Sequence, residues 1–335
     1  MKTYTIISNN SNLCKLKLST QSIPSPNKGE VLVNWKATSL NYHDYLVVMG
    51  LIQVEEDRVP MSDGAGEIVE IGEGVTEWKV GDKIMSLFFP NWTSSTPTLE
   101  TIRSIPGESI DGYMCAFSCM KEDQITRMPI NFNFFQAATL PCAGLTAWNA
   151  LMHGCKQLLP HHKVLIEGTG GMSLWALKIA MAYNVDLYAT TSSKEKANKL
   201  LDLGVTKVFD YKEDVNWGKT IFKQTGGMDH ILDVGGGSTM IQSIEAAKIG
   251  GNITSIGILG NGRKGMITFP KLFFKFINIR GIAVGSRAMQ MDLIKAVETL
   301  NIFPVIDKVF DFDNLQAAFE YQSSGKHFGK IVVKI

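Results

Sequence analysis

The feature that most constrains the fold of this chain is a glycine-rich turn between an apolar run and a helical pattern. The segment at 164–173 reads Val-Leu-Ile-Glu-Gly-Thr-Gly-Gly-Met-Ser. Its apolar start predicts a strand, and the apolar residues that recur up to Tyr183 predict a helix. A strand, a glycine turn and a helix in this order leave backbone N–H groups free at the helix N-terminus, where they bind pyrophosphate. The segment therefore predicts a dinucleotide-binding turn.

The residues of this turn have distinct expected roles. Gly168 permits the tight turn, and Gly170 and Gly171 let a phosphate approach the backbone. Ser173 replaces the third glycine of the usual pattern, so the match is incomplete and a plain turn is the alternative. We expect Gly168, Gly170, Gly171, Met172 and Ser173 to contact the pyrophosphate.

The sequence after the turn alternates between strand and helix patterns. Such alternation predicts a doubly wound parallel sheet with helices on both faces, the Rossmann arrangement. The five further strands are expected at Val185–Thr191, Lys207–Tyr211, His230–Gly235, Asn252–Leu259 and Asn278–Gly285, and the helices at Ser193–Leu203, Glu213–Thr225 and Ser238–Lys248.

The end of the second strand indicates which dinucleotide binds. An NAD site usually places an acid there to accept a hydrogen bond from the ribose 2′-hydroxyl. Here the chain reads Thr-Thr-Ser-Ser-Lys-Glu-Lys at 190–196, with hydroxyls and lysines instead. Thr191, Ser192 and Lys196 would hold a 2′-phosphate, which favours NADP(H) over NAD(H). Alternatively, Ser192 and Ser193 cap the next helix and the lysines are solvated, although a serine can do both.

Composition and charge narrow the class of protein. The 335 residues suffice for two domains, and 45% hydrophobic with 19% charged residues is typical of a soluble globular protein. A net charge of +1 argues against nucleic-acid binding, and no apolar run predicts a membrane span. The N-terminus lacks the apolar core of a signal peptide. The five cysteines are odd in number and scattered, so we expect no disulfide framework and a reducing, cytoplasmic location.

The N-terminal third reads as an antiparallel β domain without long helices, and the C-terminal end is again strand-like. We expect one domain from 1–124 and 297–335 and a dinucleotide-binding domain at 125–296 inserted between them. The expected strands are Thr3–Ser8, Glu30–Ala37, Gly64–Ile71, Asp82–Phe88, Tyr113–Met120, Val305–Phe312 and Lys330–Ile335, with a helix at Asp313–Ser323.

Several motifs, taken in order, resemble the medium-chain dehydrogenase/reductase superfamily, and within it the zinc-independent quinone-oxidoreductase-like branch. The resemblance implies a GroES-like antiparallel β domain, an inserted Rossmann domain and hydride transfer from a nicotinamide. The matching stretches are Ser39–Asp44, Ser62–Glu67, Val80–Lys83, Ala137–Trp148, the Gly168–Ser173 turn and Gly325–Lys330.

The departures from zinc-dependent members of this superfamily argue against a metal. The first ligand position is Asn41, and the usual His-Glu pair is replaced by Ser62-Asp63. Cys142 falls at a ligand position, but one thiolate cannot replace the three protein ligands of a catalytic zinc. The segment from Phe88 to Gly112 contains no cysteine, so the structural zinc lobe is missing as well. We expect no zinc, and Cys142 reads as a buried small residue.

Without a metal Lewis acid, a substrate must be electrophilic in its own right. Quinones and α,β-unsaturated carbonyls meet this requirement, with NADPH as the reductant. An NAD(P)-dependent alcohol or aldehyde dehydrogenase-reductase is the alternative. A cofactor-binding regulatory protein with vestigial catalysis is an alternative of another class.

The resemblance places Asn41, Tyr42 and Thr146 beside the nicotinamide. Tyr42 either donates to the substrate oxygen or forms an aromatic wall, and Asn41 is the second catalytic candidate. His43 can titrate near neutrality, although a lone histidine is more often structural. Asp44 is expected to make a structural hydrogen bond. Phe88, Phe89 and Trp92, with His43, either line an apolar substrate pocket or pack under a loop.

The resemblance also implies further cofactor contacts and an assembly. Relatives commonly form homodimers through the last strand of the Rossmann sheet, here Asn278–Gly285, whose apolar edge needs a cover. The further cofactor-binding candidates are Tyr211, Val234, Gly235, Gly257, Ile258, Val284, Gly285 and Ser286.

Overall fold

The computed structural model describes residues 1–7, 15–94, 96–154, 156–259, 264–265, 267 and 269–335. Ser8 of the first expected strand and two of the five cysteines, Cys14 and Cys155, lie outside the described residues. The chain forms two compact units, one of Met1–Leu145 with Val284–Ile335 and the other of Thr146–Ala283. Each unit is described by itself below.

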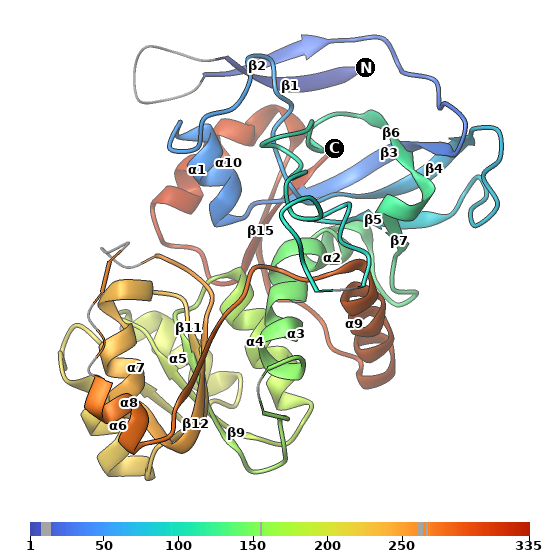
Figure 1. The fold of residues 1–335 in the computed structure, drawn as a ribbon. Coiled ribbons are helices and arrows are strands. Elements are labelled where there is room, and N and C mark those ends of the chain that lie inside the picture. Colours follow the sequence, from blue (N-terminus) through green and yellow to red (C-terminus); the bar gives the residue numbers. More distant parts are fainter. Residues whose placement is uncertain (8–14, 95, 155, 260–263, 266, 268) are drawn as a thin grey trace. The chain divides into compact units, whose positions relative to one another are not determined.

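The first unit is built around a seven-stranded sheet in which both ends of the chain take part. The order along the sheet is β14-β15-β3-β4-β5-β7, and β6 also pairs with β3. In Figure 1 the blue β3 and the red β15 are neighbours, and their pairing is antiparallel. The strands are β3 (Glu30–Ser39), β4 (Ala65–Ile71), β5 (Lys83–Ser86), β6 (Phe117–Lys121), β7 (Ile125–Arg127), β14 (Ile306–Phe310) and β15 (Lys330–Lys334), and a separate hairpin comprises β1 (Lys2–Ile7) and β2 (Lys15–Thr20).

This sheet encloses the core of the first unit. Trp35 of β3 is fully buried and lies against Tyr113, with ring centroids 4.5 Å apart. Gly64 is required at this place, because a Cβ there would lie 2.8 Å from the Trp35 ring. The β14–β15 pair is parallel, whereas the other strand pairs of this sheet are antiparallel as expected.

Of the helices in the first unit, the sequence patterns predicted only the one at Asp313–Ser323. The helices are α1 (Tyr42–Val48), α2 (Phe134–Ala137), a π-helix (Leu140–Gly144), α9 (Arg287–Leu300) and α10 (Leu315–Ser323), with short 3₁₀ turns at Glu122–Gln124 and Phe312–Asn314.

Helix α9, with 14 residues, lies where the sequence patterns predicted no helix. Its buried Gln290 donates to Ser86 O at 2.9 Å and to Thr126 Oγ1 at 2.7 Å. Its Glu298 forms an ion pair with Arg127. These contacts place α9 in the first unit, so the compact units differ in their bounds from the domains expected at 1–124 with 297–335 and at 125–296.

The second unit is a parallel sheet of six strands in the order β10-β9-β8-β11-β12-β13. This order confirms the doubly wound Rossmann sheet. In such a sheet the second and third strands lie on one side of the first strand, and the last three strands lie on its other side. The strands are β8 (Lys163–Glu167), β9 (Asp186–Thr190), β10 (Lys207–Phe209), β11 (Met228–Asp233), β12 (Ala247–Ser255) and β13 (Asn278–Gly281).

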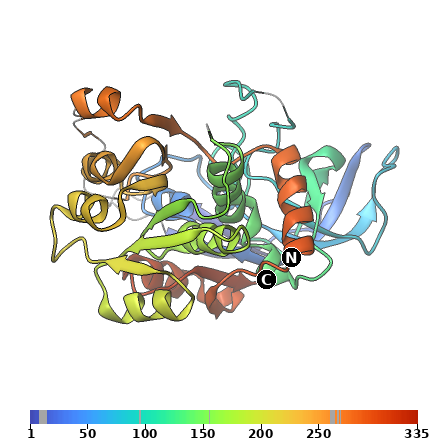
Figure 2. The same ribbon diagram turned by 90° about the horizontal axis from the view of Figure 1, so that it is seen from below.

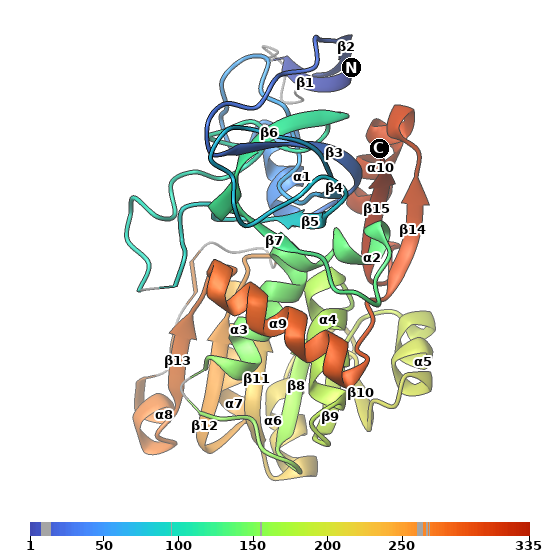
Figure 3. The same cartoon turned by 90° about the vertical axis from the view of Figure 1, so that its right-hand side faces the viewer.

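Helices lie on both faces of this sheet (Figures 2 and 3). The reversal of strand order falls between β8 and β11, and ligands of such sheets bind beyond the carboxyl ends of the strands at this point. The helices are α3 (Leu145–Met152), α4 (Gly171–Met181), α5 (Lys194–Asp202), α6 (Trp217–Thr225), α7 (Met240–Ala246) and α8 (Phe269–Phe274), with a 3₁₀ turn at Gly236–Ser238.

The predicted GroES-like and Rossmann fold class is thus confirmed, while several predicted strands run too long. β12 ends at Ser255 rather than Leu259, and β13 ends at Gly281 rather than Gly285. Val284 has φ +46°, a left-handed conformation that a strand cannot contain. Within the described residues, every helix is too short or too polar to span a bilayer.

Candidate functional site

The glycine turn has the geometry of an anion-binding site. Gly168 has φ +73°, which favours glycine, and Gly170 is the extended N-cap of α4. A Cβ on Gly170 would meet nothing within 4 Å, so the space above the turn is open. The N-cap has no side chain to bond the first-turn N–H groups, whereas Ser193 caps α5 and Ser286 caps α9. The N-terminus of α4, including Gly171 and Met172, therefore fits a pyrophosphate.

Ser173, which replaces the third glycine, supports this turn from inside. Its buried side chain donates to Glu167 O at 2.7 Å, linking the first turn of α4 to the end of β8. In the usual pattern, the third glycine lets the helix pack closely on the strand. Here the hydrogen bond of Ser173 joins the helix to the strand instead.

The two serines after β9 have different partners. Ser193 accepts from Lys196 N and is the cap of α5. Ser192 instead donates to the hydroxyl of Tyr211 at 3.0 Å, and the Tyr211 side chain is exposed. Thr191 is buried beside them and accepts from Ser193 N at 3.4 Å. The structure therefore brings Ser192 and Tyr211 together and assigns the capping role to Ser193 alone.

The ends of β11 and β12 approach each other closely. A Cβ on Gly257 would lie 2.7 Å from Val234 O, and one on Gly235 would lie 2.4 Å from the Thr239 side chain. Glycine is needed at both places for steric reasons. Ile258 is exposed next to this contact, and Thr146 is buried at the start of α3.

The segment Val284–Ser286 belongs to the first unit. Gly285 is closely packed, since a Cβ there would lie 2.9 Å from the Leu145 side chain. Ser286 accepts from Met289 N as the cap of α9. The next residue, Arg287, donates its N–H to Trp92 O at 2.9 Å, so this segment is joined to the predicted pocket residue Trp92.

Two buried carboxyl groups lie beneath the glycine turn, and sequence reasoning missed them. Glu167 ends β8 and Asp233 ends β11. Ser243 Oγ of α7 lies 2.8 Å from Glu167 Oε1 and 2.7 Å from Asp233 Oδ2. Burial, and then the charge of Asp233, raise the pKa of Glu167 to about 8. A glutamate ending an apolar strand was the only sequence signal for this pair.

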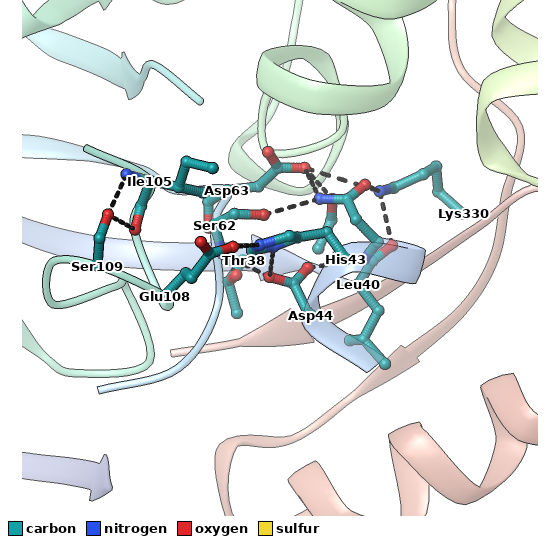
Figure 4. A network of polar contacts seen from close by, with 12 residues as sticks. Thr38, Leu40, His43, Asp44, Ser62, Asp63, Ile105, Glu108, Ser109 and Lys330 are labelled. Atoms are coloured by element: carbon teal, nitrogen blue, oxygen red, sulfur yellow. Dashed lines mark hydrogen bonds and ion pairs between the residues drawn. The ribbon is translucent and has the colours of Figure 1, made fainter. Parts of the chain in front are cut away.

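A second buried network in the first unit joins Asn41 to Ser62, Asp63 and Lys330, and these three partners are labelled in Figure 4. Asn41 Nδ2 donates to Ser62 Oγ at 3.2 Å and to Asp63 Oδ2 at 2.8 Å. Asn41 Oδ1 accepts from Lys330 Nζ at 2.6 Å. The Lys330 ammonium also donates to Leu40 O at 2.8 Å and lies 3.7 Å from Asp63 Oδ2. Asn41 therefore uses both ends of its amide to hold its neighbours.

This network does not fit a catalytic zinc. Two of its members, the Asn41 amide nitrogen and the Lys330 ammonium, present hydrogens to Asp63. A cation would have to displace both donors to reach the carboxylate. Across the described ranges, no group of three or more His, Cys, Asp or Glu side chains is arranged to hold a metal ion. The sequence analysis included Lys330 only as the last residue of a family motif. It did not predict that the Lys330 ammonium would lie beside Asn41 and Asp63.

His43 lies between two carboxylates next to this network (Figure 4). Its Nε2 is 2.7 Å from Glu108 Oε2, and its Nδ1 is 3.8 Å from Asp44 Oδ1. Burial alone would lower the pKa of His43, but these two carboxylates outweigh it and raise the pKa to about 9. Asp44 also accepts from Asn41 N and Ser62 N, each at 2.8 Å, which confirms its structural role.

The predicted pocket residues form one aromatic row. The His43 ring meets Phe88 edge-on at 5.3 Å, Phe88 meets Phe89 edge-on at 4.9 Å, and Phe89 lies 6.0 Å from Trp92. Phe88, Phe89 and Trp92 are buried. Tyr42, in contrast, is 40% exposed at the start of α1, and its ring stacks on Tyr45. Of the aromatic candidates in the first unit, Tyr42 is thus the exposed one.

Comparisons with known proteins agree with this architecture. Residues 27–130 match the alcohol dehydrogenase GroES-like domain family, and residues 171–301 match the zinc-binding dehydrogenase family. A zinc-type alcohol dehydrogenase-like protein of Schizosaccharomyces pombe is 39% identical over 331 residues, covering 96% of this chain and 95% of the relative. An alcohol dehydrogenase of Geobacillus stearothermophilus is 26% identical, with 93% of each chain covered.

A solved structure gives the same result. The crystal structure of a protein from Sinorhizobium meliloti, described as a proposed alcohol dehydrogenase, superposes with a TM-score of 0.92 at 31% identity, covering 100% of this chain and 98% of that one. With the glycine turn, the six-stranded sheet order and the two matched domains, these similarities identify the family. The chain belongs to the medium-chain dehydrogenase/reductase superfamily, whose members are oxidoreductases that use nicotinamide cofactors.

Proposed function

We propose that this chain is a zinc-independent, NADPH-dependent oxidoreductase that reduces quinones or α,β-unsaturated carbonyls. The observation that carries the proposal is the Lys330 ammonium, which lies among Asn41, Asp63 and the Leu40 carbonyl. A site whose carboxylate faces two hydrogen donors offers no Lewis acid to activate an ordinary alcohol. The substrate must then be electrophilic by itself, as quinones and enones are.

The end of β9 supports NADPH as the cofactor. Ser192 and Tyr211 form a pair of hydroxyls there, Lys196 lies in the first turn of α5, and the strand end carries no carboxylate. Hydroxyl donors and an ammonium favour a 2′-phosphate, which a carboxylate would repel. NADPH, when bound, supplies the hydride.

The residues of the first unit then have separate tasks. Tyr42 is exposed and carries the hydroxyl that we assign as donor to the substrate oxygen. The aromatic row from His43 to Trp92 supplies an apolar wall. Asn41 and Lys330 act through their contacts and hold the strand ends in place. Orientation and one hydrogen bond are the expected sources of rate.

An alcohol or aldehyde dehydrogenase-reductase is the second candidate. It is favoured by the names of the relatives, which are called alcohol dehydrogenases or zinc-type alcohol dehydrogenase-like proteins. A cofactor-binding protein with vestigial catalysis is the third.

A spectrophotometric substrate panel tests the three candidates. NADPH and NADH oxidation is followed with quinones, enals and enones, and simple aldehydes, before and after treatment with a chelator. Chelator-resistant NADPH oxidation with quinones or enals is the expected result. Turnover confined to simple aldehydes would favour the second candidate, and cofactor binding without turnover would favour the third.

We further propose a cytoplasmic homodimer that pairs through β13. This strand is at the edge of the parallel sheet, and α8 beside it in sequence exposes Phe269, Phe273 and Phe274. Light scattering at micromolar concentration should give the mass of two chains.

A further inference from the structure

The two carboxyl groups beneath the glycine turn, Glu167 and Asp233, make more hydrogen-bond contacts than their neutral donors have hydrogens to supply. Glu167 receives the Val234 N–H, at 3.3 Å, and contacts Ser243 Oγ. Asp233 receives the Gly236 N–H at 2.8 Å and the Thr239 hydroxyl at 2.7 Å, and it also contacts Ser243 Oγ. Ser243 has one hydroxyl hydrogen, which can serve one of its two carboxyl contacts. The other contact requires a hydrogen on a carboxyl oxygen.

The distribution of donors shows which carboxyl holds this proton. Besides Ser243, Asp233 accepts from the Thr239 hydroxyl at 2.7 Å and from the Gly236 N–H at 2.8 Å, whereas Glu167 accepts from the Val234 N–H at 3.3 Å. The Gly235 N–H acts on both carboxyl groups and does not distinguish them. The more strongly solvated carboxylate keeps its charge. The arrangement is therefore a chain in which Glu167 Oε1–H donates to Ser243 Oγ, and the Ser243 hydroxyl donates to Asp233. The pKa of Glu167, raised to about 8, agrees with this assignment.

The proton lies close to the dinucleotide turn. Glu167 directly precedes Gly168, its carbonyl accepts from Ser173, and β9 places Thr190 beside it. Asp233 is the charged group that bears on Glu167, and the neighbouring side chains of α4 and α7, Ser173 and Ser243, do not titrate in this range. Ionised Glu167 would add a second buried negative charge beneath the turn, and both carboxylates would oppose the charge of a pyrophosphate.

We propose that dinucleotide binding to this chain is linked to the protonation of Glu167, so that the cofactor binds with uptake of a proton and is released more readily when Glu167 ionises. The inference rests on the nicotinamide-cofactor site of the proposed function and adds a regulation to it. The negative charge of the pyrophosphate disfavours ionisation of Glu167, and ionised Glu167 disfavours the pyrophosphate. Binding of the anion and protonation of Glu167 therefore favour each other.

The experiment measures the Kd of NADPH and of NADH for the wild type and for Glu167→Gln between pH 7 and 9.5. Glutamine imitates the protonated acid, because its amide can donate to Ser243 and accept from Val234. For the wild type we expect Kd to rise roughly fivefold to tenfold, the change produced when binding raises a pKa by about one unit. The variant should keep the Kd of the wild type at pH 7 over the whole range. The exposed Asp202→Asn is the matched control and should behave as the wild type.

Calorimetry at pH 8 in two buffers of different ionisation enthalpy adds a direct readout. The wild type should take up a fraction of a proton for each cofactor bound, and Glu167→Gln should take up none. The same pH dependence with NADH excludes the 2′-phosphate as its source. A flat Kd in the wild type, or an equal slope in Glu167→Gln, would overturn the inference while leaving the proposed function intact. Binding of neither dinucleotide would overturn both.

Discussion

The two units of this protein each bury acidic side chains next to a strand, and they neutralise them in different ways. In the first unit, Asp63 is compensated by the Lys330 ammonium and the Asn41 amide. In the second unit, Glu167 and Asp233 share the hydroxyl of Ser243, and among the described residues neither forms an ion pair with a lysine or arginine. A buried charge must be paired or neutralised, because its desolvation is costly.

The difference determines which conditions can change the charge of each cluster. The first cluster is Asp63 with Lys330 and Asn41, and the second is Glu167 and Asp233 with Ser243. In the first cluster, burial raises the pKa of Asp63 to about 6 against the opposing charge of Lys330, so the carboxylate is ionised and paired with the lysine at neutral pH. A shared proton can leave, so the second cluster responds to pH and to nearby anions. The following predictions test this contrast.

Removing the ammonium should have the largest effect. Lys330→Met leaves Asp63 buried without its cation and should lower the free energy of unfolding by about 3–5 kcal/mol. Lys334→Met, an exposed lysine of the same strand, is the control and should change little. Adding Asp63→Asn to Lys330→Met should recover part of the loss in denaturant unfolding. An unchanged stability of Lys330→Met would show that the ion pair does not neutralise this cluster.

Tyr42→Phe should affect chemistry in the first unit without affecting the cofactor site in the second. If the hydroxyl donates to the substrate oxygen, turnover should fall by about tenfold to a thousandfold while the Kd of NADPH stays unchanged. Quinones should show the smaller effect, because their reduced form is already stabilised by aromaticity. Steady-state kinetics with both substrate types measures this, and unchanged turnover with both would leave Tyr42 as a wall.

The proton of the second cluster should appear in the pH dependence of stability. The folded-state pKa of Glu167 lies above its unfolded value, so the folded state binds more protons and stability falls as pH rises through about 8. Between pH 7 and 9 the wild type should lose about 1–2 kcal/mol relative to Glu167→Gln. Taking the difference between the two proteins removes the contribution of His43, whose pKa is also raised. Parallel curves from denaturant unfolding would contradict the assignment.

Lys196→Ala should weaken NADPH binding by about 1–2 kcal/mol, the loss of one charge-assisted contact. NADH should bind nearly as before, and Lys194→Ala, two residues earlier in α5, is the control. Fluorescence titration measures all of these affinities. Tighter binding of NADH than of NADPH by the wild type would contradict the cofactor assignment.

Treatment with a zinc chelator should have the smallest effect on activity. Because an ammonium and an amide already occupy the carboxylate of the first cluster, a chelator should leave activity unchanged and the purified protein should contain less than a stoichiometric amount of zinc. One tightly bound zinc per chain in elemental analysis would contradict the assignment of the Lys330 ammonium as the cation that compensates Asp63.

Local patterns in the sequence were sufficient for the fold. The strand, turn and helix at 163–181 were predictable because neighbouring residues decide them, and the alternation after them implied the parallel sheet. The positions of Asn41, Ser62 and Asp63 also sufficed to doubt a zinc site. Helix α9 was missed, and β12 and β13 were predicted too long, because tertiary contacts and the left-handed Val284 decide their bounds.

Only the tertiary structure decided how the buried charges are satisfied. Lys330 meets Asn41 across 289 positions, and Ser243 meets Glu167 across 76. Hydrophobic periodicity places a residue inside or outside, but it does not tell which polar atoms meet inside. The sequence alone therefore determined the two-unit fold and its glycine turn. Folding determined that one buried acid is held by a lysine and the other by a proton, since each depends on atoms that only the complete packing brings within 3 Å or so of one another.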